Sequence, residues 1–155
     1  MTTHIWRLYL DASVVGGCFD SDFIEDSRRV MDAVFAGKAR LLYSEVLEAE
    51  LRNAPEPVRR FFAEVPDAVR EEIEFSAEVE ELAREYVARG VVSDAHLDDC
   101  RHVAAATIGR ADAIVSWNFR HIVKLDKIKG YNQVNLLNGY GVLTILSPKE
   151  VSFDE

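Results

Sequence analysis

The alternation of short apolar runs with helical stretches constrains the fold of this chain more than any other feature. Apolar runs predict strands at 5–10, 39–43, 112–116 and 143–146, with a less strongly patterned strand at 72–75. Helical spacing and capping residues predict helices at 23–35, 45–52, 58–64, 78–89 and 93–108. Strands interleaved with helices in this way predict one α/β domain over residues 1–155, built on a mainly parallel sheet.

Single residues mark the ends of several predicted elements. Ser44 is a candidate N-cap, because its hydroxyl can accept a hydrogen bond from an unpaired amide in the first turn of a helix. Gly37 and Gly90 stand where two helices are expected to stop. The pair Gly16-Gly17 predicts a loop after the first strand, and residues 117–119 predict a turn or short helix after a later one.

The composition is that of a soluble globular protein. Hydrophobic residues make up 48% of the chain, enough to form a core, which excludes disorder for most of its length. No apolar run approaches the ~20 residues that a membrane-spanning helix needs. Residues 1–7 lack the features of a signal peptide, and Cys18 and Cys100 form no C-x-x-C pair. We therefore expect a cytoplasmic protein with free thiols and no membrane attachment.

The net charge of −9 excludes the broad basic surface that nucleic-acid-binding proteins usually carry. A polyanionic substrate would need a local basic patch or bridging cations. The best candidate patch is the segment 120–129, which holds Arg120, Lys124, Lys127 and Lys129. The alternative is that this segment is an ordinary loop that balances charge.

Polar residues gather where the predicted strands end. Asp11 closes the first strand, Ser44 the second, and Ser116 to Asn118 follow a later one. The carboxyl ends of parallel strands meet at one edge of a sheet, where ligands bind in open α/β folds. Acids brought together there would raise one another's pKa, and a divalent cation removes that cost. Oxygen ligands suit Mg²⁺ or Mn²⁺, but with 27 acidic residues in the chain the spacing alone leaves the ligands open.

Four segments, in order, resemble the PIN-domain nucleases, especially the VapC-like toxins of bacterial toxin–antitoxin pairs. They are residues 8–13, 43–51, 99–107 and 112–122, and the stretch Ser-Trp-Asn-Phe-x-His-Ile in the last is the most specific. A tail with Asn132, Asn135 and Gly139-Tyr140 fits one subgroup. The likeness covers nearly the whole chain.

The resemblance implies a PIN-like three-layer α/β/α sandwich and an endoribonuclease that depends on Mg²⁺ or Mn²⁺ and hydrolyses RNA phosphodiester bonds. The family's acids map to Asp11, Glu50 and Asp99, and its fourth position maps to Asn118; these four would bind metal and serve catalysis. The resemblance also implies a homodimer and a cognate antitoxin as partners. One departure is His121, where many members carry a further acid, so a second metal site would be weakened.

Neighbouring acids compete for two of these roles. Glu45 and Glu48 share a helix with Glu50, and Asp94 and Asp98 lie close to Asp99. Adjacent helix positions differ by about 100°, so Asp98 and Asp99 should not both point inward.

For the four histidines, roles other than metal binding are the simpler interpretation. His102 is expected to pack in the core or to support a ligand, and His121 to be an exposed loop residue that could contact RNA or hold Asn118. His4 and His96 show no metal-ligand spacing.

Other functions are less well supported by the sequence. Phosphoryl transfer through an aspartyl intermediate would need a second acid two residues after Asp11, where Ser13 stands. A nucleotide-binding module would need a Gly-rich phosphate loop, and Gly16-Gly17 is not one. The main alternative is a catalytically degenerate PIN domain that binds RNA or protein without cutting it.

Overall fold

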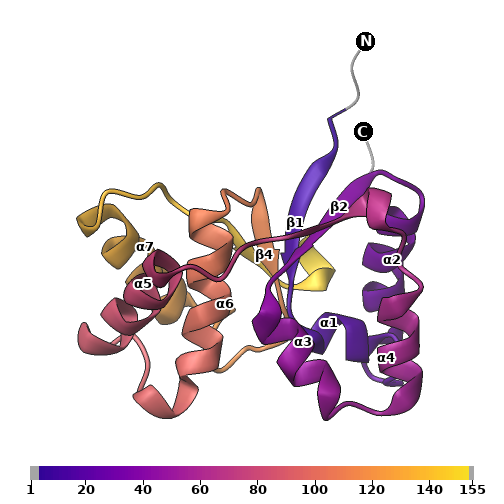
Figure 1. Ribbon diagram of the computed structural model, residues 1–155, viewed down its shortest axis with the longest axis horizontal. Coiled ribbons are helices and arrows are strands. Elements are labelled where there is room, and N and C mark those ends of the chain that lie inside the picture. The colour runs from indigo at the N-terminus through magenta and orange to yellow at the C-terminus, as the bar shows by residue number, and fades with distance from the viewer. Residues whose placement is uncertain (1–3, 154–155) are drawn as a thin grey trace.

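The computed structural model of the protein describes residues 4–153 and has a five-stranded sheet in the order β3-β2-β1-β4-β5 (Figure 1). The strands are β1 (Trp6–Leu10), β2 (Ala39–Tyr43), β3 (Arg70–Glu72), β4 (Ala113–Val115) and β5 (Ile145–Leu146). Every neighbouring pair runs parallel, and Leu8 of β1 lies opposite Leu41 of β2 and Ala113 of β4. The predicted parallel sheet is confirmed.

Helices cover both faces of the sheet (Figure 1). One layer holds α1 (Ala12–Gly17), α2 (Ile24–Phe35), α3 (Glu45–Arg52) and α4 (Glu56–Ala63). The other holds α5 (Ala77–Ala88), α6 (Leu97–Ile108) and α7 (Leu125–Leu137). Single 3₁₀ turns lie at Asp67–Val69, Asp94–His96 and Pro148–Glu150. The predicted three-layer α/β/α sandwich is confirmed.

Successive residues of a strand pack into two separate hydrophobic cores, one on each face of the sheet. Leu8 and Leu10 of β1 pack with α1 to α4, whereas Tyr9 between them packs with α5 to α7. This follows from the two-residue period of a strand, which sends successive side chains to opposite faces of the sheet. Cys18 and Cys100 are free, buried and in different cores.

Most predicted boundaries agree with the structure to within a few residues, and Gly37 and Gly90 end their helices at φ +78°. The strand expected at 72–75 lies instead at Arg70–Glu72. The helix expected from residue 93 begins with the 3₁₀ turn Asp94–His96.

Two expectations fail. The loop predicted at Gly16-Gly17 is the end of helix α1, which Asp11 caps by accepting a hydrogen bond from the amide of Ser13. Helix α7 was not predicted, because its sequence contains Gly130 and two asparagines and lacks a clean apolar stripe. Packing stabilises it instead: Tyr131, Val134 and Asn135 are buried against the neighbouring helices.

The strand order creates a switch point beside β1. The chain moves outward from β1 to β2 and β3, then returns to place β4 on the other side of β1. Ligands in open α/β folds bind outside the carboxyl ends of the strands at such a point. Within residues 4–153, no helix is long and apolar enough to cross a membrane.

Gly17 tests the packing of α1. A Cβ atom there would lie 2.3 Å from Ser27 Oγ and 3.0 Å from Trp117 Nε1, whereas one at Gly16 would meet nothing within 4 Å. We expect Gly17→Ala to lower the free energy of unfolding by about 1–3 kcal/mol, as overpacking does. Urea denaturation followed by tryptophan fluorescence measures it. Gly16→Ala is the matched control, and equal stability of the two variants would contradict the packing described.

Candidate metal centre

Asp11 lies at the switch point, and both of its carboxylate oxygens are hydrogen-bonded. It follows β1 directly and its side chain is 5% exposed. Oδ1 accepts from the hydroxyl of Ser13 at 2.5 Å, and Oδ2 accepts from the hydroxyl of Ser116, just after β4, at 2.6 Å. The carboxylate therefore joins the ends of two adjacent strands.

The turn after β4 is ordered by the same serines. Ser13 Oγ accepts from the amide of Trp117 at 2.9 Å, and Ser116 Oγ accepts from the amide of Asn118 at 2.9 Å. Asn118 Oδ1 in turn accepts from the amides of Arg120 and His121. The oxygen of Asn118 is thus used by its own turn, and its amide group donates to Asp99.

A chain of hydrogen bonds orients Glu50. Glu50 Oε1 lies 2.6 Å from His102 Nε2, and His102 Nδ1 lies 2.8 Å from the Tyr9 hydroxyl. The Tyr9 hydroxyl lies 2.8 Å from Ser44 Oγ, which also caps α3 by accepting from the amide of Val46. The predicted N-cap at Ser44 is confirmed, and His102 supports Glu50 rather than simply filling the core.

The charge state of His102 decides which groups donate and which accept in this series of hydrogen bonds. Burial by itself lowers the pKa of His102, but the interactions with Tyr9, Glu50 and Asp11 outweigh it and raise the pKa well above its ordinary value. When the ring is protonated it donates from both nitrogens, so that the Tyr9 hydroxyl accepts from His102 and is free to donate to Ser44.

The three predicted acids act on one another. Burial raises the pKa of Asp11, and the charge of Glu50 raises it further, although His102, Ser116 and Ser13 oppose the shift. Burial also raises the pKa of Asp99, with the charge of Asp11 adding to it and His102, His121 and Asn118 opposing it. The charge of Asp11 therefore interacts with Asp99, and the charge of Glu50 interacts with Asp11.

The competing acids lie elsewhere. Asp98 is 65% exposed and pairs with Arg101, whereas the side chain of Asp99 is 19% exposed. Glu48 meets Glu72, and a hydrogen bond between the two side chains raises the pKa of Glu48. Glu45 and Asp94 are exposed.

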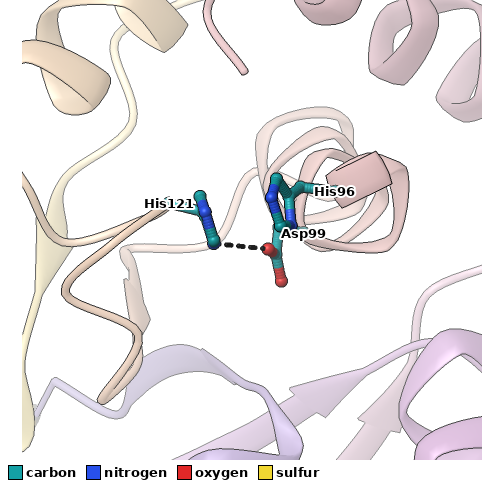
Figure 2. Close-up of side chains that lie close together, drawn as sticks. All are labelled: His96, Asp99 and His121. Carbon is teal, nitrogen blue, oxygen red and sulfur yellow. Dashed lines mark ion pairs between the residues drawn. The ribbon is translucent and has the colours of Figure 1, made fainter. Parts of the chain in front are cut away.

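Two histidines, His96 and His121, lie beside Asp99. His121 Nδ1 lies 3.4 Å from Asp99 Oδ2, and the rings of His96 and His121 stack with centroids 3.6 Å apart (Figure 2). One ligand atom from each of the three residues lies within 4.8 Å of the others. The sequence spacing of His96 did not indicate this group, because His121 is distant from it in sequence.

Only some basic side chains of the segment 120–129 are free to contact a polyanion. Arg120, Lys124 and Lys129 are exposed, whereas Lys127 donates to the backbone oxygen of Val91. Lys124 and Lys127 both lie within 4.0 Å of Asp126. The segment was expected to be a loop if it did not bind RNA, and its second half belongs to α7.

The donor set fits a divalent cation in chemical type. Asp11, Glu50 and Asp99 supply carboxylate oxygens, the ligands that Mg²⁺ and Mn²⁺ prefer. Burial raises the pKa of Asp11 and of Asp99, and the charge of Asp11 adds to the shift at Asp99; a bound cation would relieve this cost of ionisation.

No protein-family model matches the sequence, and no curated protein sequence matches it. Solved structures do match the fold. VapBC2 from Rickettsia felis, solved with a promoter DNA fragment, is 13% identical, with a TM-score of 0.59; the match covers 91% of this chain and 98% of that one. Mycobacterium tuberculosis VapC20, a sarcin–ricin loop cleaving toxin, is 16% identical, with a TM-score of 0.56 and coverage of 74% and 92%. FitAcB from Neisseria gonorrhoeae is 12% identical, with a TM-score of 0.57 and coverage of 93% and 99%. The fold is therefore PIN-like.

The burial of Asp11 should cost stability when no metal is present. A raised pKa means that the folded state holds a proton that the unfolded chain has released, so stability falls as pH rises from the ordinary value of 3.8 through the folded-state pKa. At neutral pH in EDTA we expect Asp11→Asn to melt at a higher temperature than the wild type, since Asn also caps helices well. Mg²⁺ or Mn²⁺ should raise the melting temperature of the wild type and leave that of Asp11→Asn unchanged.

Asp98→Asn is the matched control, because exposed ion pairs contribute only ~0–1 kcal/mol. A lower melting temperature for Asp11→Asn than for the wild type in EDTA would show that burying the charged carboxylate of Asp11 does not lower the stability of the folded protein.

The hydrogen bonds that orient Glu50 through His102 should require the hydroxyl of Tyr9. Tyr9→Phe leaves the buried Nδ1 of His102 without its partner, so we expect a loss of about 1–3 kcal/mol in the free energy of unfolding. Tyr140→Phe, at a half-buried site, should change it by less than about 0.5 kcal/mol. Chemical denaturation compares the two, and matching losses would mean that the hydrogen bond contributes nothing specific.

Proposed function

We propose that this protein is a metal-dependent endoribonuclease that hydrolyses RNA phosphodiester bonds. The observation that carries the proposal is the buried Asp11 at the switch point of a PIN-like sheet, where it interacts electrostatically with Glu50 and with Asp99. The same fold occurs in VapC20, whose described activity is cleavage of the sarcin–ricin loop. The solved neighbours therefore support RNA as the substrate class.

Each residue would have a separate task. Asp11, Glu50 and Asp99 would hold Mg²⁺ or Mn²⁺, with Ser13 and Ser116 fixing Asp11 and His102 fixing Glu50. A divalent ion supplies the positive charge that activates water and stabilises the leaving oxygen of a phosphodiester. Asn118, predicted as a fourth ligand, would act mainly by orienting Asp99, because its oxygen already accepts two backbone amides.

The acidic chain would accept RNA through these cations and through the exposed Arg120 and Lys129 that follow the site. We further propose that the protein is the toxin of a toxin–antitoxin pair, acting in the cytoplasm as a homodimer that a cognate antitoxin inhibits. The likeness to VapBC2 and FitAcB supports the antitoxin partner.

A second function remains in competition: a PIN-like module that binds RNA without cutting it. Two observations favour it, since Glu50 Oε1 is hydrogen-bonded to His102 and the Asn118 oxygen is used by its turn. Binding without cleavage in the presence of Mg²⁺ or Mn²⁺ would establish this alternative.

The nuclease proposal is tested by incubating purified protein with total RNA and following fragment ends by sequencing. We expect cleavage with Mg²⁺ or Mn²⁺ and none in EDTA. Asp11→Asn and Asp99→Asn should each slow cleavage by at least about 100-fold, because a catalytic cation is worth several kcal/mol. Asp98→Asn should cleave at the wild-type rate, and induced expression should be toxic for the wild type and Asp98→Asn alone. Cleavage that survives EDTA, or Asp11→Asn that cuts as fast as the wild type, would rule out the proposal.

A further inference from the structure

A second set of metal ligands lies beside the acids, and only Asp99 belongs to both. His96 ends the 3₁₀ turn before α6, Asp99 lies in the first turn of α6, and His121 follows β4. Figure 2 shows His121 reaching Asp99 from one side while His96 lies alongside from the helix. Three segments thus deliver two imidazoles and one carboxylate to one place.

The position of His121 is fixed by its backbone. Its amide donates to Asn118 Oδ1 at 2.9 Å, and its carbonyl oxygen accepts from the Tyr131 hydroxyl at 2.6 Å. Tyr131 is fully buried, so the turn is held against α7. A ligand whose backbone is held in this way keeps its geometry when the metal is absent.

The donor types select the ion. Imidazole nitrogen favours Zn²⁺ and similar transition metals, whereas Mg²⁺ favours oxygen. Two histidines and one carboxylate, with a fourth position open, form a common zinc ligand set, in which bonds of about 2.0–2.2 Å place ligand atoms about 3.3 Å apart. One ligand atom from each residue already lies within 4.8 Å of the others, and rotation of the stacked His96 and His121 rings would turn their nitrogens toward a shared ion.

We propose that His96, Asp99 and His121 bind one divalent transition-metal ion, Zn²⁺ in preference to Mg²⁺. The inference goes beyond the proposed nuclease function, because binding at this cluster requires neither RNA nor cleavage. Asp99 is the connection between the two sites, since one carboxylate serves both.

The test uses untagged protein titrated with Co²⁺, followed by its visible absorption, and with Zn²⁺ by calorimetry. Excess Mg²⁺ is present throughout to occupy oxygen-ligand sites. We expect one equivalent to bind. His96→Ala and His121→Ala should each weaken binding at least about 10–100-fold, the loss that even supporting residues of metal sites cause. His4→Ala is the matched control, because His4 is an exposed histidine paired with Asp112 and should leave the affinity unchanged.

A second variant tests selectivity rather than affinity alone. His121→Asp replaces a nitrogen with an oxygen ligand, so the preference for Zn²⁺ over Mn²⁺ should fall by about tenfold or more. Circular dichroism of each variant confirms that it is folded. Zn²⁺ affinity unchanged in both His96→Ala and His121→Ala, or displaced by Mg²⁺ in the wild type, would overturn the proposal. RNA cleavage without Zn²⁺ binding would remove this inference alone, and Zn²⁺ binding without cleavage would remove the nuclease proposal alone.

Discussion

The hydrogen bond between Asp11 and Ser116 is the interaction on which the rest of the site depends. It joins the carboxyl ends of β1 and β4, the two strands that flank the switch point. The burial that this position imposes raises the pKa of Asp11, and the serines that satisfy the carboxylate also order the turn toward Asn118. A single buried acid thus sets the strand junction, the first helix and the electrostatics of the neighbouring acids.

The fold was largely predictable because strand and helix patterns are local. β2 and α3 have the predicted bounds, and Ser44 caps α3 as its position between them indicated. Helix α7 was missed because the burial of Tyr131 and Asn135 stabilises it. Asn135 counts as a polar residue in a hydropathy pattern, although its side chain is buried and forms hydrogen bonds with Thr107 and Tyr86. Helix α1 was missed because its glycines suit a loop as well as a close contact with Ser27.

Helix geometry predicted which of two adjacent acids points toward the other candidate ligands. Asp98 and Asp99 diverge because they are adjacent on α6, which places only Asp99 beside the acids of the other elements. The link from Glu50 through His102 to Tyr9 joins three segments, and no spacing encodes it. The same reason hid His96: its stacking on His121 depends on how the turn after β4 folds back over α6.

Helix α7 contributes no residue to either set of proposed metal ligands, yet it holds one of them, His121, in place. The Tyr131 hydroxyl donates a hydrogen bond to the carbonyl oxygen of His121, and the Tyr131 ring packs edge-on against Tyr86 of α5. The Tyr86 hydroxyl in turn donates to Asn135 Oδ1. The layer of α5 to α7 therefore helps to set the position of His121. A substitution at Tyr131 or Tyr86 would alter the geometry that the proposed ligands offer an ion while every one of those ligands stays unchanged.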